Sequence, residues 1–190
     1  MPASPSSAPP VSSYLQELPA WARELSEKYY SRSFAMFVLY GNVRDLVPLR
    51  SKNSTDFVDL NEFLSSALFG QRDLVLQYDR GGLSFGNADT QADFRRAVEG
   101  YDTFHGTAYA QAIPRNPDAV LNLLDNYLRL RIADGKKIAL IIDFAETIAP
   151  AGDVSTMSAD DRNALVILKR WARNPVFLNA DVTICLISEN

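Results

Sequence analysis

Four short, mainly apolar runs divide the chain and predict buried strands. They cover residues 34–40, 73–78, 138–142 and 181–187. Continuous apolar runs of this length are typical of strands that are buried on both faces, as in parallel sheets. The runs alternate with longer segments in which apolar residues recur at three- and four-residue steps, which is the spacing of amphipathic helices.

The helical spacing places one helix in each gap between the predicted strands, and two in the second gap. We expect helices over residues 55–70, 88–101, 116–135 and 158–175. Ser54 or Thr55 can cap the first of these helices and Gly70 can end it.

The remaining segments predict connections, and the order of the elements predicts the architecture. Residues 41–54 are expected to form a loop, and residues 80–87, which are rich in glycine, a loop or a short hairpin. Strands that alternate with helices require crossover connections, which place helices on both faces of a parallel sheet. The predicted fold class is therefore α/β, a three-layer domain with a parallel sheet of four or five strands flanked by helices.

The two ends of the chain differ from its middle. Residues 1–12 are rich in Pro, Ser and Ala and predict a disordered tail. Residues 13–33 have helical spacing and predict an N-terminal helical segment, which either kinks or restarts at Pro19. Residues 34–190 form the α/β domain. Because the sequence stops just after an apolar strand, we expect it to be the front part of a longer protein; the alternative is a natural end with this strand at the sheet edge.

Composition and charge argue against nucleic acid and membranes as partners. Hydrophobic residues make up 47% of the chain and charged residues 22%, with a net charge of -4, so nothing indicates a basic face for nucleic acid. No run reaches the ~18 apolar residues that a membrane helix needs, and no secretory signal opens the chain. We therefore expect a cytoplasmic protein with neither nucleic acid nor membrane as a partner.

The single cysteine and the single histidine argue against a disulfide, a His/Cys metal site and a Ser-His-Asp hydrolase. The single Cys185 cannot form a disulfide within one chain, which is consistent with a reducing compartment. One His and one Cys argue against a His/Cys metal site. His105 is not accompanied by a nucleophile elbow, which argues against a Ser-His-Asp hydrolase.

Each predicted strand ends in polar or charged residues. In open parallel sheets, ligands bind beyond the carboxyl ends of the strands, so these residues are the candidates for a site. They are Gly41, Asn42, Arg44, Asp45, Asp79, Arg80, Asp143, Glu146, Ser188, Glu189 and Asn190. Asp143 is the best candidate, because it follows the most apolar strand directly.

The segment KKIALIIDFAE resembles the Walker B element of P-loop NTPases, in which the acid at the strand tip holds Mg²⁺. The order of segments over residues 34–190 is also similar to the N-terminal portion of an AAA-type ATPase. FAMFVLYGN stands at the first strand and the start of the phosphate loop, and DVTICLISEN stands at the sensor-1 strand.

This resemblance implies a P-loop-NTPase-like fold and a set of nucleotide-site positions. Asp143 stands at the magnesium position, and Glu146 is the residue nearest to the catalytic glutamate. Asn190 stands at the polar tip of the sensor-1 strand. The remaining positions, at the phosphate loop, are Gly41, Asn42 and Arg44.

The departures from the family pattern predict that the nucleotide chemistry is lost. A phosphate loop reads G-x-x-x-x-G-K-[ST], but residues 41–54 contain one glycine, and no Gly-Lys-Ser/Thr triplet occurs in the chain. Pro48 removes a backbone donor, and Asp45 adds negative charge where phosphates would lie. The catalytic glutamate would directly follow Asp143, but Phe144 stands there, and an apolar ring cannot orient water.

Two hypotheses follow. The resemblance implies a non-catalytic domain that docks partners, shapes an assembly or regulates, while a downstream module binds and hydrolyses ATP with Mg²⁺. This chain would then hold no cofactor, and its partners would be other proteins, the downstream ATPase domain or further copies of the chain. The alternative is a stand-alone α/β enzyme or ligand-binding protein that uses Asp143, Glu146 and Arg44 at the strand tips.

Overall fold

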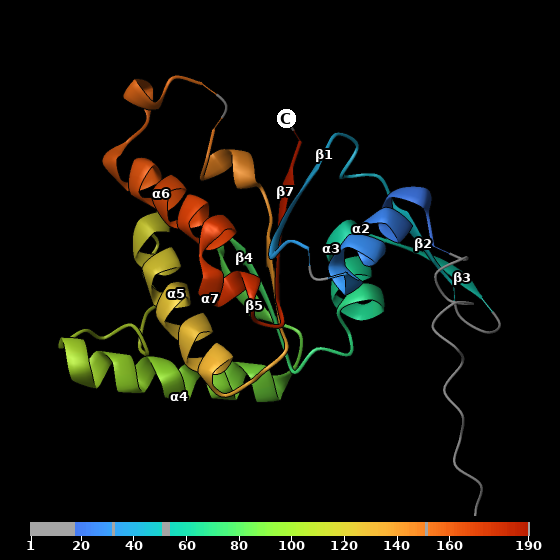
Figure 1. Cartoon of the computed structure of the whole chain (residues 1–190). Helices are drawn as coiled ribbons and strands as arrows, with labels where there is room; N and C mark the ends of the chain where they lie inside the picture. Colours follow the sequence, from blue (N-terminus) through green and yellow to red (C-terminus); the bar gives the residue numbers. More distant parts are fainter. Residues whose placement is uncertain (1–17, 32, 51–53, 151, 190) are drawn as a thin grey trace, which may run out of the picture.

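The computed structural model describes residues 18–31, 33–50, 54–150 and 152–189, and it contains a central five-stranded sheet (Figure 1). The strand order is β1-β7-β6-β4-β5. All neighbours are parallel except β5, which pairs antiparallel with β4. The strands are β1 (Met36–Tyr40), β4 (Leu74–Asp79), β5 (Gly82–Phe85), β6 (Ile138–Ile142) and β7 (Val182–Ser188). The predicted three-layer α/β class is confirmed, and the sheet is mostly parallel, with β5 as its antiparallel strand.

Helices cover both faces of the sheet, as Figure 1 shows. One face carries α4 (Ala88–His105), α5 (Pro117–Ala133), α6 (Ala159–Arg173) and the short α7 (Pro175–Leu178). The other face carries α2 (Ala20–Tyr30), α3 (Leu60–Glu62) and a π-helical segment, η1 (Phe63–Leu68). Two 3-10 turns, η2 (Ala145–Thr147) and η3 (Val154–Thr156), lie in the connection from β6 to α6.

Strand β6 is the centre of the fold because its side chains enter two separate cores. Ile138, Leu140 and Ile142 belong to the core under α4, α5 and α6, which we call the first core. Ala139 and Ile141 belong to the core under α2 and η1, which we call the second core. Every residue of β6 is buried, so the continuous apolar run predicts a two-sided strand correctly.

The segment after β1 differs from the prediction. Residues 41–54 were expected to be a loop and residues 55–70 a helix, but β2 (Val47–Arg50) and β3 (Thr55–Val58) form an antiparallel hairpin there. The helix begins only at Leu60, and the Asp59 side chain caps it by accepting a hydrogen bond from the Glu62 amide at 2.8 Å. The predicted cap at Ser54 or Thr55 is therefore wrong, because residues 55–58 pair with β2 instead of continuing the helical spacing backwards.

Other local predictions are confirmed. Helix α2 begins at Ala20, directly after its N-cap Pro19, which agrees with a helix start at this proline. Residues 80–87 form the turn and second strand of the β4–β5 hairpin. The last strand does not lie at the sheet edge, however, because β7 is placed between β1 and β6. The predicted tail over residues 1–12 and the helical residues 13–17 lie outside the described part of the chain.

No helix in the described residues is both long enough and apolar enough to cross a membrane.

The reactivity of the Cys185 thiol tests whether the second core is closed to solvent. This residue is fully buried in β7, and burial raises the pKa of its thiol to about 12. We expect a thiol reagent at pH 8 to leave the folded protein unlabelled and to label it after unfolding in guanidinium. The unfolded thiol loses its proton near pH 8.5 to 9, so this part of the stability is complete at lower pH and is lost between there and pH 12.

The size of this effect at pH 10 is on the order of 1–2 kcal/mol. Urea denaturation of the wild type and of Cys185→Ala at pH 7 and pH 10 measures it, because the variant lacks this thiol and should lose less stability. Equal losses in the two proteins would contradict the burial of the thiol.

Candidate functional site

Asp143 lies at the carboxyl end of β6, where the sheet positions it through its backbone. Its amide donates to the carbonyl of Tyr78 at 2.9 Å, which extends the pairing of β6 with β4 by one residue. Only 10% of its side chain is exposed. A carboxylate so enclosed needs charged or polar partners, and the neighbouring strand ends supply them.

Arg44 is the cation that meets this carboxylate. Its Nη1 lies 2.9 and 3.0 Å from the two carboxylate oxygens of Asp143, and its Nε donates to Oε1 of Glu189 at 2.7 Å. Arg44 follows β1, Asp143 follows β6 and Glu189 follows β7, so one guanidinium joins three strand ends. The hydrogen bond to Asp143, followed by that to Glu189, raises the pKa of Arg44 above its ordinary value.

Two further donors complete the environment of Asp143. Nδ2 of Asn61 lies 2.6 Å from Oδ2, and the Phe144 amide donates to Oδ1 at 2.7 Å. Each carboxylate oxygen therefore accepts two hydrogen bonds. Charge-assisted hydrogen bonds of this kind are the strong ones in proteins, so the carboxylate is both neutralised and held in one orientation.

Phe144 turns the chain away from the sheet directly after Asp143. Its φ of 50° is the one positive φ of a non-glycine residue in the described part of the chain. Such a conformation is strained for a bulky side chain and persists only where its surroundings hold it. Here the guanidinium carbon of Arg44 lies 3.9 Å from the centre of the Phe144 ring, a cation–π contact. The ring thus covers the guanidinium that neutralises Asp143.

The loop after β1 does not form a cradle of free amides. Gly41, with φ of 100°, starts a tight turn in which the Val43 amide donates to the Gly41 carbonyl at 2.7 Å. The Asp45 amide donates to the Asn42 carbonyl at 3.3 Å. The chain then continues into β2, so no helix N-terminus backs the loop. A phosphate loop needs both features, because unpaired amides and a helix N-terminus together attract the anion.

The N-terminus of α3, the next helix, is capped by a side chain of the protein itself. The Asp59 carboxylate accepts from the Glu62 amide at 2.8 Å, so an internal carboxylate occupies the position of an anion on α3. Asn61, in the first turn of the same helix, is the residue that reaches Asp143.

The predicted site residues separate into four groups. Arg44 and Asp143 are brought together. Gly41 and Asn42 lie exposed in the loop and have no hydrogen bond to Asp143. Glu146 lies in η2 with its Oε2 buried and without a hydrogen-bond partner in the described part of the chain. Asn190 lies outside the described residues.

Asn61 was missed by the sequence prediction, and Glu189 was noticed only as a strand-end residue. Glu189 follows β7 directly, so its position could be expected, but its pairing with Arg44 depends on the loop conformation. Asn61 gave no signal, because it was expected within a helix that starts earlier than the observed one.

The arrangement does not fit a magnesium–nucleotide complex. Mg²⁺ takes oxygen ligands in near-octahedral geometry, and the oxygens of Asp143 are already occupied by a cation and by amide donors. No group of three or more His, Cys, Asp or Glu side chains that could hold a metal occurs among the described residues. The buried Oδ1 of Asn61 also has no partner within the described part, but one amide oxygen does not make a metal site.

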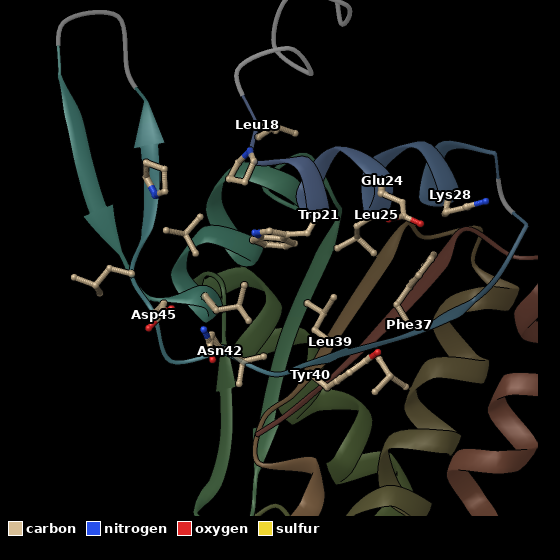
Figure 2. A pocket seen from close by; sticks show the side chains of 17 residues that line it. Leu18, Trp21, Glu24, Leu25, Lys28, Phe37, Leu39, Tyr40, Asn42 and Asp45 are labelled. Atoms are coloured by element: carbon tan, nitrogen blue, oxygen red, sulfur yellow. The ribbon is translucent and has the colours of Figure 1, made fainter. Parts of the chain in front are cut away.

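A separate groove lies beside β1, under α2 and next to the start of β2 (Figure 2). Its volume is about 1030 Å³. The lining is mainly apolar, with Glu24, Lys28 and Asp45 as its charged members. Asn42 is the one residue of the predicted nucleotide positions that lines this groove in the described chain, and the Arg44–Asp143 pair does not. The groove and the ion pair are therefore two distinct features.

Comparison with protein families gives a match over nearly the whole chain. A family model described as "AAA+ chaperone, N-terminal Rossmann-like domain" matches residues 4–190. A search of curated proteins found no match.

Among solved structures, a chain in the "Structure of E. coli MS115-1 HORMA:CdnC:Trip13 complex" is 18% identical, with a TM-score of 0.46. The aligned part covers 95% of this chain and 54% of that chain, so the present sequence spans about half the length of the matched chain. At this identity and TM-score, the likeness adds nothing to the fold already described.

A double-mutant cycle tests whether Arg44 and Asp143 stabilise the fold as a pair. We expect Arg44→Ala and Asp143→Ala each to lower the free energy of unfolding by about 1–3 kcal/mol, because each leaves a partly buried charge without its partner. Arg44 is 38% exposed, so solvent screening keeps the values well below those of a fully buried pair. The double variant should lose about 1 kcal/mol less than the sum of the single losses.

The matched control is the ion pair of Arg80 with Asp161, in which the arginine is 45% exposed. Its coupling should be smaller, about 0.2–0.5 kcal/mol, because its two side chains are 45% and 16% exposed, against 38% and 10% for Arg44 and Asp143. Denaturation by urea measures all six variants. Equal coupling in the two pairs would show that the Arg44–Asp143 contact is an ordinary surface pair.

Proposed function

Since the chain belongs to the family of AAA+ chaperone N-terminal Rossmann-like domains, we propose that it is the non-catalytic NTPase-fold domain of an AAA-type ATPase. In this proposal, ATP binding and hydrolysis are carried out by a downstream module. The present domain serves assembly, regulation or the docking of partners.

The contact of Arg44 with Asp143 is the observation that carries the proposal. In the P-loop-NTPase pattern, the acid at this strand tip holds Mg²⁺. Here a guanidinium lies 2.9 and 3.0 Å from the two carboxylate oxygens, and it is itself held by Glu189 and covered by Phe144. To bind Asp143, Mg²⁺ would have to displace the guanidinium of Arg44, which Glu189 and Phe144 hold in place.

The charges around the pair also disfavour phosphates. Arg44 contributes one positive charge, while Asp143 and Glu189 contribute two negative charges, and Asp45 lies exposed in the same loop. The local sum, excluding Asp45, is thus about −1. A triphosphate requires the opposite sign, together with backbone amides that point at it.

The position after Asp143 lacks a group that could activate water. Phe144 stands there, and its ring lies on Arg44. Glu146, two positions further along, lies in η2 and makes no hydrogen bond to Asp143. General-base catalysis needs a group within hydrogen-bond reach of the attacking water, and a phenyl ring has no such capacity.

The role left to the domain is recognition. Its proposed partners are the downstream ATPase module, other proteins or further copies of the chain, and it would hold no cofactor of its own. The whole protein would use ATP and Mg²⁺ in the downstream module. A stand-alone enzyme acting through Asp143, Arg44 and Glu146 is less well supported, because the first two are engaged with each other.

A nucleotide-binding test on the purified chain checks the proposal. We expect 1 mM ATP or ADP with Mg²⁺ to leave the melting temperature unchanged and the chain to show no ATP turnover. A ligand present at about 100 times its dissociation constant would stabilise the fold by about 2.7 kcal/mol, which the measurement resolves easily.

Arg44→Ala is the informative variant for this test. It frees the Asp143 carboxylate but leaves the loop without a cradle, so it too should fail to bind ATP. Mg²⁺-dependent ATP turnover by the wild-type chain that disappears in Asp143→Ala would overturn the proposal.

A further inference from the structure

The C-terminal end of α4 and the loop after it carry four aromatic side chains that lie against one another. The rings of Tyr101 and Tyr109 are stacked, with an interplanar angle of 19° and 6.0 Å between their centres. The imidazole of His105 lies 4.2 Å from the Tyr101 ring, and the Phe104 ring meets the same imidazole edge-on at 4.8 Å. We call these four residues the aromatic patch.

The aromatic patch is open to solvent. Phe104 is 85% exposed, which is the highest value for a large apolar side chain in the described part of the chain. His105 is exposed as well, and Tyr101 and Tyr109 are half-buried where they pack against the first core. A single exposed ring needs no explanation, but several contiguous ones indicate a surface on which another molecule docks.

The side chain of Asp102 holds the aromatic patch in one arrangement. Its carboxylate accepts hydrogen bonds from the amides of Tyr109 at 2.9 Å and Ala110 at 2.7 Å. Gly106 ends α4 in the left-handed conformation, with φ of 68°, and its amide donates to the Asp102 carbonyl at 2.8 Å. The loop that carries Tyr109 is thus fixed to the helix that carries Tyr101, so a ligand that binds both rings does not have to order them.

Stacked, exposed aromatic rings are suited to proline-rich segments. A polyproline II helix has three residues per turn and no internal hydrogen bonds. Prolines that recur three positions apart therefore lie along one edge, and aromatic-lined surfaces bind that edge. The backbone carbonyls of such a segment stay free to accept hydrogen bonds, and tyrosine hydroxyls can donate them. The two tyrosines of the aromatic patch supply both the rings and the hydroxyls.

The chain itself contains a segment with this chemistry. Residues 1–12 include Pro2, Pro5, Pro9 and Pro10 and no charged side chain. Pro2 and Pro5 are three positions apart, so a polyproline II conformation would place them on the same edge. Because proline already fixes φ near −65°, little backbone freedom is lost when such a segment binds. We therefore compare this segment, residues 2–10, with the aromatic patch.

The proline-rich segment is too short to reach the aromatic patch of its own chain. Helix α2 begins on one side of the molecule, over the second core, and α4 ends on the opposite side, over the first core (Figure 1). The 13 residue steps from Pro5 to Leu18 span at most about 45 Å. A domain of 190 residues is about 40 Å across, so the path over its surface between opposite sides is about 60 Å.

We propose that the aromatic patch at the end of α4 binds the proline-rich segment, residues 2–10, of a second copy of this chain. The segment and the aromatic patch are different surfaces, so the contact is head-to-tail and closes either as a reciprocal dimer or as a ring. This inference goes beyond the proposed function, because it does not depend on a nucleotide or on a downstream module.

A peptide titration tests the binding chemistry. The protein is the full 190-residue chain with its own segment disabled by four substitutions, which we call the segment variant: Pro2→Ala, Pro5→Ala, Pro9→Ala and Pro10→Ala. We expect a synthetic peptide of residues 1–12 to shift the amide NMR signals of residues 101–110. It should bind at least about tenfold more tightly than the same peptide with alanine at the four positions. Equal binding of the two peptides, or no shift at these amides, would overturn the proposal.

Phe104→Ala in the segment variant tests the surface. We expect it to weaken peptide binding at least about fivefold, because it removes the most exposed ring of the aromatic patch. Phe57→Ala is the matched control, since Phe57 is 66% exposed and lies in β3. It should leave peptide binding unchanged. Both substitutions should keep the melting temperature within about 2 °C, as is usual for exposed positions. Equal peptide binding by the two proteins would contradict the assigned surface.

A mixing experiment tests whether the contact joins two copies. In sedimentation velocity, we expect the wild-type chain to associate, and the segment variant and Phe104→Ala each to associate less at the same concentration. An equimolar mixture of the two should regain association, because the intact segment of one protein meets the intact aromatic patch of the other. A mixture that stays monomeric would overturn the proposal.

The other possible occupants give different results. A wild-type chain that binds the peptide but stays monomeric up to about 1 mM, where even a millimolar contact is visible, would assign the aromatic patch to another protein or to the chain's own segment. Either result would overturn the proposal. The nucleotide test uses neither the prolines nor the aromatic patch, so this proposal and the proposed function can fail separately.

Discussion

The ion pair of Arg44 with Asp143 is the contact through which the loop after β1 is attached to the middle of the sheet. It joins residues that are far apart in the chain, and Glu189 extends it to β7. Asn61 brings the first turn of α3 to the same carboxylate. The ends of β1, β6 and β7 and the start of a helix thus meet around one carboxylate, and the conformation of each depends on the others.

The same contact neutralises the carboxylate at this strand tip from within the protein. A carboxylate at the tip of a buried strand must be neutralised, whether by a metal ion, a proton or a side chain. Once an arginine from the neighbouring loop supplies the charge, the strand tip is stable without a bound ion. The loop can then satisfy its own amides in tight turns, and the chain can leave it as a hairpin, as residues 41–58 do.

Much of the fold could be predicted from the sequence, because a strand that is buried on both faces consists almost entirely of apolar residues. The run at residues 138–142 is apolar throughout, since each side chain enters one of two cores. The β2–β3 hairpin could not be predicted, because its strand β3 is mostly exposed and its polar and apolar residues resemble the start of a helix.

At the candidate site, Arg44 and Asp143 were identified from the sequence as strand-end residues. Their contact depends on the backbone dihedral angles of the loop, which the pattern of apolar and polar residues does not determine. Asn61 depends in turn on where α3 begins, and that start was predicted several residues too early.

The left-handed backbone of Phe144 restricts which side chains this strand tip can accept. Replacing the phenylalanine by glutamate would recreate the acidic pair of the family pattern in sequence alone. The new carboxylate would start from a strained backbone with φ of 50°, and the ring that now covers Arg44 would be gone. A substitution at residue 144 therefore also changes the surroundings of Arg44 and of the loop after β1, so these positions are structurally coupled.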